Sequence, residues 1–394
     1  MDLFKKCRDY KVPQQVKALG YYPYFKAIQS AQDTEVTIEG QRAIMIGSNN
    51  YLGLTNDPRV KEAAVRAVER YGTGCTGSRF LNGTLEIHEE LEYRLARFQR
   101  RQAALVFSTG FQTNLGAISA LVRKGDWVII DRDDHASIVD GCRLSFGKNV
   151  KFKHNDPDDL DRVLASAGRR AGKLVVVDGV FSMLGDVCEL AAIARVSRQH
   201  GARLMVDDAH AIGVLGAHGR GTAEHSGVED QVDIVMGTFS KSFASLGGFI
   251  ASDTDVIEYV KHHGRSMIFS AAMPPAAVAT VLAALDIIEQ EPERREWLWA
   301  NVRKMKEGLA RLGFDTGTSQ TPIIPIIIGD DLKTFRLWRA LLENGVYTNA
   351  AISPAVPPGM SLLRTSYMAT HTSEQLDRVL EVFEKVGRSM GVIP

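Results

Sequence analysis

The sequence has few cysteines and no excess of charge of one sign. Its four cysteines, Cys7, Cys75, Cys142 and Cys188, form no C-x-x-C pair, so the spacing indicates neither a zinc ribbon nor a disulfide framework. Lys plus Arg and Asp plus Glu number 47 each, and this balance gives no global field that would attract nucleic acid or an acidic membrane. We therefore expect a protein of a reducing compartment with no nucleic-acid partner and no metal site.

Long apolar runs are also absent. No run approaches the roughly 20 apolar residues of a membrane-spanning helix, and the first segment, MDLFKKCRDYKVPQQVKALG, lacks the apolar core and cleavage site of a signal peptide. We therefore expect a cytoplasmic protein that is neither exported nor membrane-spanning. Leu3, Phe4, Lys5 and Lys6 allow a peripheral contact with a bilayer, but a short solvated helix is the preferred interpretation.

What the sequence does contain is an alternation of short apolar runs with helical patterns. A chain of 394 residues, 45% hydrophobic and 24% charged, is long enough for two to three packed units. Helical patterns at 58–72 and 85–99 are followed by five apolar runs, at 103–108, 127–131, 173–179, 203–208 and 232–238. This alternation predicts an α/β fold with a mostly parallel central sheet.

The two ends of the chain have a different pattern. Alternating β-branched residues around Glu39 and Gly40 predict a small hairpin, and a helical region at 276–313 resembles a bridge out of the sheet domain. Beyond it, two strands and a final helix at 373–387 indicate a smaller α+β domain. We therefore predict three parts, which are an N-terminal arm (1–56), a large α/β domain (57–290) and a small C-terminal α+β domain (291–394).

Polar side chains gather where the apolar runs end. Open α/β sheets bind ligands at the carboxyl ends of their strands, and the five ends here are STGFQTN, DHAS, DGVFSM, DDAH and GTFSKS. They contain a lysine, acids, two histidines and several hydroxyls. We therefore expect the chemistry at this edge of the sheet.

Three of these residues together suit pyridoxal 5'-phosphate (PLP). Lys241 directly follows a strand, where a Schiff-base lysine can project into a cleft, although a lone lysine is more often solvated. Asp207 ends another strand, and His210 follows it by three residues. A buried carboxylate facing a pyridine nitrogen keeps that nitrogen protonated, whereas Asp207 alone would be a helix cap. The combination favours the cofactor site.

A phosphate seat is also present. Gly110 and Phe111 follow a strand and begin a helix, so backbone amides and the helix dipole can bind an anion. Thr238 and Ser240 add hydroxyl donors. The alternative is an ordinary turn that needs its glycine for conformation. His135 can lie over a flat aromatic ligand or move protons, and a structural role is an equal alternative.

One motif is set aside. Residues 72–77, GTGCTG, match the dinucleotide pattern G-x-G-x-x-G. That pattern requires a strand before the glycines, whereas a helical pattern precedes them here. We therefore expect no nicotinamide site.

The chain resembles the α-oxoamine synthase family over essentially its whole length. This resemblance implies a fold-type-I PLP transferase fold, like that of aspartate aminotransferase, in a homodimer with active sites at the subunit interface. Members condense an amino acid with an acyl-CoA and release carbon dioxide. The segments that carry the resemblance are IQSAQDTEV, GSNNYLGL, YGTGCTGSRFLNGTLEIHEELE, FSTGFQTNLG, DHASIVDG, VDDAHAIGVLG, GTFSKSFASLGGFIA, FSAAMPP and RTSYMATHT.

The resemblance assigns a catalytic set. Lys241 matches the lysine that carries the cofactor, and Asp207 matches the residue that faces the pyridine nitrogen. His210 matches the partner of the cofactor's phenolic oxygen, and His135 matches the residue stacked on the ring. We expect these four residues to act in catalysis.

Further cofactor contacts follow in the same way. By the same resemblance, Gly110 and Phe111 are expected to line the cofactor, Ser182 to lie beside its ring, and Thr238 and Ser240 to hold its phosphate.

Substrate and subunit contacts complete the expected site. Ser270 and Ala271 match positions that reach the phosphate of the neighbouring subunit. Arg364 matches the arginine that binds the substrate carboxylate, and Asn49 matches a residue of the amino-acid pocket. Tyr367 departs from the family, where a smaller or aliphatic residue is expected, and this bears on substrate specificity.

Within the family, the chain is most similar to soluble bacterial members that join L-serine to palmitoyl-CoA, a long-chain acyl-CoA, giving 3-oxosphinganine, coenzyme A and carbon dioxide. Members that use alanine and pimeloyl-CoA, or glycine, are the nearest alternatives. A simple aminotransferase is another. A non-catalytic scaffold subunit should lack the cofactor lysine, which is present as Lys241.

Overall fold

The computed structural model describes residues 2–168 and 170–394. The chain forms two compact units. The large unit is Asn49–Trp297, and the small unit joins the segment up to Ser48 with Leu298–Pro394. Whether the predicted segments 1–56, 57–290 and 291–394 are independent domains stays a prediction.

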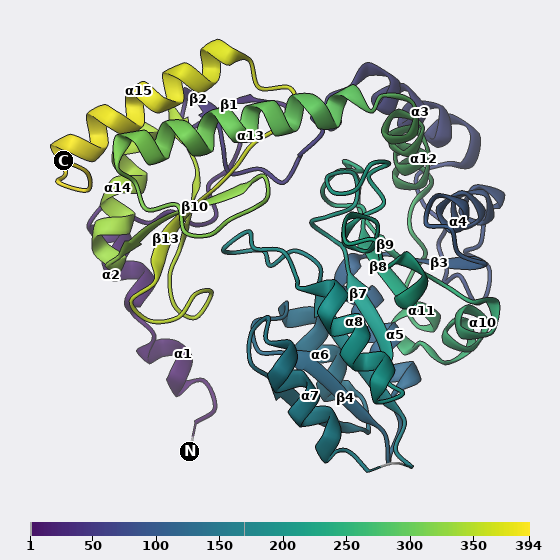
Figure 1. Ribbon diagram of the computed structural model, residues 1–394. Helices are drawn as coiled ribbons and strands as arrows, with labels where there is room; N and C mark the ends of the chain where they lie inside the picture. The colour runs from purple at the N-terminus through teal and green to yellow at the C-terminus, as the bar shows by residue number, and fades with distance from the viewer. Residues whose placement is uncertain (1, 169) are drawn as a thin grey trace. The chain divides into compact units, whose positions relative to one another are not determined.

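The large unit is built on one central sheet (Figure 1). Its seven strands have the order β3-β9-β8-β7-β6-β4-β5. All neighbouring pairs from β8 to β5 are parallel, and β9 alone runs antiparallel to its neighbours β3 and β8. The prediction of a mostly parallel sheet is therefore confirmed. The strands are β3 Ala103–Phe107, β4 Trp127–Asp131, β5 Lys148–Phe152, β6 Lys173–Asp178, β7 Arg203–Asp207, β8 Ile234–Thr238 and β9 Gly248–Ser252.

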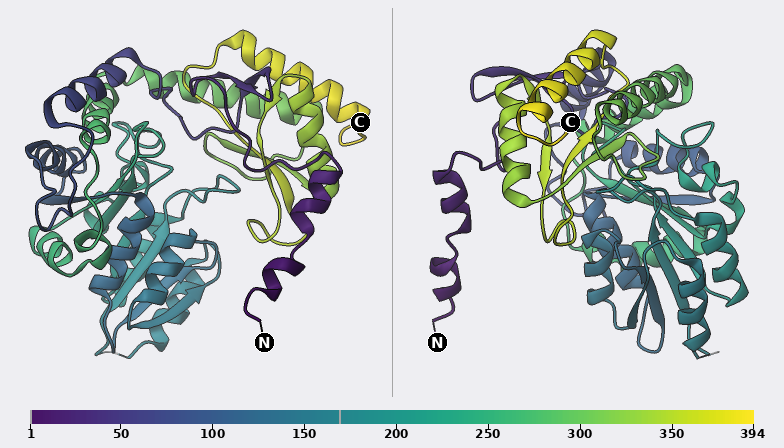
Figure 2. Two further views of the ribbon diagram at one scale, coloured as in Figure 1. Left: turned by 180° about the vertical axis from the view of Figure 1, so that it is seen from behind. Right: turned by 60° about the vertical axis from the view of Figure 1, so that its left-hand side comes forward.

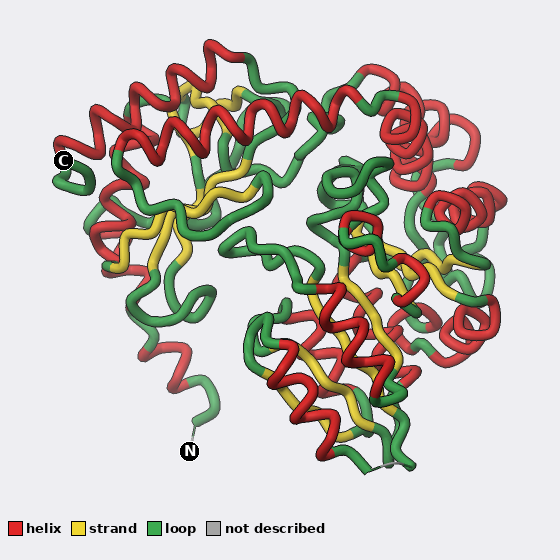
Figure 3. Tube along the Cα trace, viewed as in Figure 1, coloured by secondary structure: helices red, strands yellow, loops and turns green. Residues whose placement is uncertain are grey.

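Helices cover both faces of this sheet. Successive strand residues point to opposite faces, and apolar residues on both faces need to be buried. Val128 and Ile130 of β4 pack with α5 and α6, whereas Ile129 between them packs with α7 and α8. Helices and strands alternate along most of this unit (Figure 3). Its helices are α3 Pro58–Tyr71, α4 Glu86–Phe98, α5 Gly110–Leu121, α6 Ala136–Leu144, α7 Pro157–Ser166, α8 Leu190–Gln199, α9 Thr222–His225, η1 Glu229–Gln231, α10 Thr254–His263, α11 Arg265–Ile268 and α12 Pro275–Gln290.

The helical region predicted at 276–313 is not continuous. Helix α12 ends at Gln290, and α13 begins at Glu293 and runs to Leu312. Pro292 lies between them. Proline has no N–H to donate and disfavours helical backbone at the preceding residue, so it ends the first helix here.

The small unit contains two three-stranded sheets, β1-β2-β11 and β10-β13-β12. The predicted hairpin is confirmed, since Ile38 pairs with Gln41 across Glu39 and Gly40, whose φ angles are 51° and 75°. Helices α13 and α15 lie side by side (Figure 2) and are joined by a Lys304–Asp377 ion pair of 2.6 Å. The remaining elements are α1 Lys5–Asp9, α2 Val12–Ala18, β1 Glu35–Ile38, β2 Gln41–Met45, β10 Ile323–Gly329, α14 Asp331–Glu343, β11 Val346–Tyr347, β12 Asn349–Ala351, β13 Ser361–Ser366 and α15 Ser373–Ser389.

In the part of the chain that the structure describes, no helix combines the length and the apolar composition needed to cross a bilayer.

Candidate active site

A cavity of about 290 Å³ lies in the large unit, at the carboxyl ends of its parallel strands. Its walls come from segments that are far apart in sequence, as the strand-end rule predicts. Nine of the predicted site residues line it, namely Gly110, Phe111, His135, Ser182, Asp207, His210, Thr238, Ser240 and Lys241. The structure thus brings these residues together, while their individual roles stay predictions.

Lys241 lies on a short loop that is fixed at both ends. The loop leaves β8 after Thr238 and returns into β9 at Gly248. The Phe239 amide donates to the Gly247 carbonyl at 2.9 Å, and the Ala244 amide donates to the Lys241 carbonyl at 2.9 Å. Because the loop is tied to itself and to the sheet, the lysine is presented to the cavity from a rigid frame.

Asp207 is held by two hydrogen bonds. Its side chain is buried, with a residue exposure of 4%. The Ala209 amide donates to Oδ1 at 3.0 Å, and Nδ2 of the fully buried Asn114 donates to Oδ2 at 2.7 Å. A carboxylate has further lone pairs, so this one can still accept a proton donor from the cavity.

The same network reaches His135. Asn114 Nδ2 also donates to Ser137 Oγ at 2.8 Å, and Ser137 Oγ lies 2.7 Å from His135 Nδ1. The Ser137 amide donates to the same ring nitrogen at 3.3 Å, which makes Nδ1 an acceptor. A neutral His135 therefore carries its proton on Nε2.

Burial and charge set the protonation of the neighbouring groups. Burial lowers the pKa of His135, and the Lys241 ammonium lowers it further although Asp207 opposes the change. The pKa of Asp178, which also lines the cavity, is raised well above its usual range by burial and by the charge of Asp207. The lowered pKa favours the neutral imidazole of His135 at neutral pH.

His210 is linked to the residue predicted for the amino-acid pocket. The Tyr51 hydroxyl lies 2.7 Å from His210 Nδ1 and 3.3 Å from Asn49 Oδ1. Tyr51 is almost fully buried, with 1% exposure. The tyrosine therefore fixes the orientation of the His210 ring from behind the cavity wall.

The predicted phosphate seat has the form of a helix N-terminus beside two hydroxyls. Gly110 is the first residue of the 12-residue helix α5, and the Thr109 hydroxyl caps it by accepting from the Gln112 amide at 3.1 Å. Thr238 Oγ1 and Ser240 Oγ lie 3.0 Å apart. A Cβ atom at Gly110 would be 2.6 Å from Thr238 Oγ1. Glycine is therefore needed for close approach, and the amides with the hydroxyls form a seat for an anion.

Five other predicted or noted positions do not line this cavity, namely Ser270, Ala271, Asn49, Arg364 and Tyr367. Gln112 Nε2 donates to Ser270 Oγ at 3.1 Å, and Ser108 Oγ donates to the Ala271 carbonyl, so both positions flank α5 without lining the cavity. Arg364 is buried on β13 of the small unit. Its predicted contact with substrate, and those of Ser270 and Ala271 with a neighbouring subunit, stay predictions. Tyr367 is fully buried in the small unit.

Sequence reasoning missed three residues that organise the cavity, namely Asn114, Ser137 and Tyr51. Each lies inside a segment whose other residues point to the site. Asn114 follows Gly110 by four residues, which places the two on the same face of α5. This spacing was a usable signal, whereas nothing in the sequence relates Tyr51 to His210.

Known proteins resemble this chain over nearly its full length. Residues 42–383 match the family described as aminotransferase class I and II. A serine palmitoyltransferase from Sphingobacterium spiritivorum is 52% identical over 384 residues, covering 98% of this chain and 96% of the relative. An 8-amino-7-oxononanoate synthase from Symbiobacterium thermophilum is 47% identical over 379 residues, covering 96% and 97%. The structure of a serine palmitoyltransferase from S. paucimobilis with bound PLP–myriocin aldimine has a TM-score of 0.97 at 41% identity, with 100% of each chain covered.

Proposed function

Because this chain belongs to the aminotransferase class I and II family, we propose that it is a PLP-dependent acyltransferase that condenses L-serine with palmitoyl-CoA, giving 3-oxosphinganine, coenzyme A and carbon dioxide. The observation that carries the proposal is the single cavity that gathers Lys241, Asp207 and His135 beside an anion seat. The 52% identity to a serine palmitoyltransferase supports the choice of substrates.

The residues of the cavity fit PLP. The Lys241 amine suits the aldehyde carbon, the Asp207 carboxylate suits the pyridine nitrogen, and the neutral His135 ring suits the face of the pyridine. The amide of Gly110 and the hydroxyls of Thr238 and Ser240 suit the phosphate. A Cβ atom at position 110 would occupy this seat, which the glycine leaves open. When bound, PLP supplies an electron sink for negative charge at the substrate Cα.

The protein's own groups then divide the remaining work. Asn114 and the Ala209 amide hold Asp207 in one orientation, so its charge stays directed at the cavity. The Lys241 amine takes the proton from the substrate Cα as a general base. Arg364 holds the substrate carboxylate through a bidentate, charge-assisted pair.

The condensation forms one new carbon–carbon bond. Cα, having lost its proton to Lys241, bonds to the thioester carbonyl carbon of palmitoyl-CoA, and the C–S bond breaks to release coenzyme A as a thiolate. The bond between Cα and the serine carboxylate then breaks to release carbon dioxide. A proton returned to Cα completes 3-oxosphinganine.

We also propose that the active enzyme is a cytoplasmic homodimer whose sites lie at the subunit interface. Ala271, predicted to reach the neighbouring phosphate, is exposed, and nearby Phe269 has a residue exposure of 75%. Such a surface is expected where a second copy packs. Light scattering of the holoenzyme should give twice the subunit mass of 43.3 kDa, and a fully active monomer would contradict the proposal.

The substrates are tested by measuring coenzyme A release. Serine, alanine and glycine are each paired with palmitoyl-CoA and with pimeloyl-CoA, and Lys241→Ala serves as the inactive control. We expect serine with palmitoyl-CoA to give the highest kcat/KM. A preference for alanine with pimeloyl-CoA would assign the activity of the 47% identical 8-amino-7-oxononanoate synthase instead. Amino transfer to a keto acid without coenzyme A release would indicate an aminotransferase.

A further inference from the structure

A short hairpin brings Ser182 to the cavity. Val180 and Val187 form an antiparallel bridge at its base, and the Phe181 amide donates to the Asp186 carbonyl at 3.0 Å. Gly185, with φ of 71°, makes its turn. A hairpin of this length is only marginally stable by itself, so the position of Ser182 depends on what holds the hairpin from outside.

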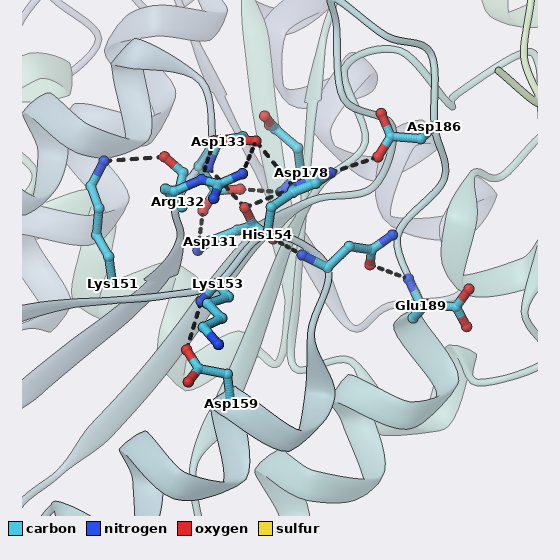
Figure 4. A network of polar contacts seen from close by, with 12 residues as sticks. Asp131, Arg132, Asp133, Lys151, Lys153, His154, Asp159, Asp178, Asp186 and Glu189 are labelled. Atoms are coloured by element: carbon cyan, nitrogen blue, oxygen red, sulfur yellow. Dashed lines mark hydrogen bonds and ion pairs between the residues drawn. The ribbon is translucent and has the colours of Figure 1, made fainter. Parts of the chain in front are cut away.

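His154 holds this hairpin, although it does not line the cavity. It follows β5, and its ring lies between two carboxylates (Figure 4). Nε2 donates to Asp186 Oδ2 at 2.8 Å, and Nδ1 donates to Asp131 Oδ1 at 3.0 Å. The ring also meets Phe181 of the hairpin edge-on, with centroids 4.4 Å apart. One side chain thus joins the hairpin to the end of strand β4.

The other end of this bridge leads to His135. Asp131 Oδ1 accepts from the Asp133 amide at 2.8 Å, and the Asp131 amide donates to Asp134 Oδ2 at 2.9 Å. Asp134 Oδ1 accepts from the Asp178 amide at 2.8 Å, and Asp178 Oδ2 accepts from the His135 amide at 2.8 Å. The loop that presents His135 is therefore built on Asp131.

Asn155, the next residue in the sequence, also joins the Asp131 loop to the hairpin. Its amide donates to Asp131 Oδ2 at 2.6 Å, and its Nδ2 donates to the Val187 carbonyl at 3.0 Å. Two consecutive residues therefore contact both the Asp131 loop and the base of the hairpin. The arrangement has the form of a clamp, which we call the His154 clamp (His154 with Asn155).

The charge of His154 suits this position. Burial alone would lower its pKa, but the hydrogen bonds that the ring donates to Asp131 and Asp186 raise the pKa to about 10. At neutral pH the ring is an imidazolium, and both of its nitrogens donate. Asp131 is fully buried, so removal of the imidazolium leaves a buried carboxylate without its counter-charge.

We propose that His154 is a positioning residue for the cofactor cavity, because its ring contacts tie the hairpin that carries Ser182 to the loop that carries His135. The inference rests on the proposed function, since it assigns His154 a role in fixing two residues that would contact PLP. His154 itself touches neither substrate nor cofactor. It acts through Asp131 and Asp186, as an outer-shell partner does at other cofactor sites.

The test compares His154→Gln with His200→Gln. His200 is a matched control because its Nε2 pairs with a carboxylate, Asp161 Oδ1, at 2.7 Å, away from the cavity lining. Apoenzyme is titrated with PLP, and the visible circular dichroism of the bound cofactor and the kcat and KM of coenzyme A release are recorded. In His154→Gln we expect the PLP dissociation constant to rise about tenfold and kcat/KM to fall about 10- to 100-fold, with altered cofactor dichroism. His200→Gln should match the wild type in all three.

A second variant keeps the proposal testable if His154→Gln does not fold. Asp186→Asn leaves the His154–Asp131 contact in place and weakens only the hairpin side. Asp186→Asn should shift the PLP dissociation constant and the cofactor dichroism in the same direction as His154→Gln does. In the double variant the two effects should not add, because both changes break one bridge.

The outcomes separate the two proposals. A wild-type protein that binds no PLP or releases no coenzyme A would overturn the proposed function. If the wild type does both, and folded His154→Gln or Asp186→Asn binds PLP with the wild-type dissociation constant and dichroism, the role of His154 is overturned while the proposed function stands.

Discussion

Asn114→Ala removes the side chain that joins Asp207 to Ser137. Its Nδ2 donates to Asp207 Oδ2 at 2.7 Å and to Ser137 Oγ at 2.8 Å, and the residue is fully buried. The Ala209 amide still donates to the other carboxylate oxygen, so the Asp207 side chain keeps one of the two hydrogen bonds described above. The change therefore tests one contact of the cavity wall without deleting a predicted cofactor ligand.

The expected cost follows from these contacts. A hydrogen bond to a charged group contributes about 1.5 to 3 kcal/mol, and one between neutral groups about 1 kcal/mol. Asn114 Oδ1 is buried without a hydrogen-bond partner among the described residues, so the substitution also removes an unpaired acceptor, which offsets part of the loss. We expect the free energy of unfolding of the apoenzyme to fall by about 2 kcal/mol.

Urea unfolding of the apoenzyme, with PLP titration of the folded variant, measures both effects. The PLP dissociation constant should rise about tenfold, the equivalent of about 1.4 kcal/mol, because Asp207 is less firmly oriented. Ser119→Ala is the control, since Ser119 lies on the same helix and its hydroxyl donates to the Leu115 carbonyl of that helix at 2.5 Å. An unfolding free energy within about 0.5 kcal/mol of wild type, with unchanged PLP affinity, would refute the role of Asn114.

Three further predictions concern the same unit. Gly110→Ala places a Cβ atom 2.6 Å from Thr238 Oγ1, so the hydroxyl must move, and PLP titration should show a dissociation constant raised about tenfold. Tyr51→Phe removes the 2.7 Å contact with His210 Nδ1, worth about 1 kcal/mol, and steady-state assays should show kcat/KM lowered about fivefold in a normally folded protein. His154 has a folded-state pKa of about 10 against an ordinary 6.5. Its stabilisation is therefore complete below pH 6.5 and is lost as the pH rises through 10, so the unfolding free-energy difference between wild type and His154→Gln should shrink by about 2 kcal/mol from pH 6 to pH 10; a constant difference would contradict it.

The sequence predicted five of the seven strands of the large sheet, β3, β4, β6, β7 and β8, because each is a short apolar run that is mostly buried. Two strands escaped prediction. In β5, KNVKF, polar residues dominate because it is an edge strand with most of its residues exposed or half-buried. Strand β9, GFIAS, overlaps the end of GTFSKSFASLGGFIA, a segment interpreted for its site residues and not as a strand. Its antiparallel direction depends on pairing with β3 and β8.

The candidate site was predictable to the extent that it obeys the strand-end rule. Asp207 ends a strand of the parallel part of the sheet, and Lys241 and His135 each follow one, so topology alone brings them to one edge. Contacts such as Asn114 with Asp207 and Tyr51 with His210 join residues 93 and 159 positions apart. No local pattern encodes such pairs, because they depend on how the helices and loops pack against the finished sheet.

In the proposed function, Lys241 carries PLP. Holoenzyme is reduced with borohydride, digested and analysed by mass spectrometry, in the wild type and in Lys241→Ala. We expect the mass of the reduced cofactor on the peptide that contains Lys241, and no lysine-linked cofactor in the variant. Cofactor attached to another lysine in the wild type, or a reducible lysine-linked cofactor retained in Lys241→Ala, would contradict the account.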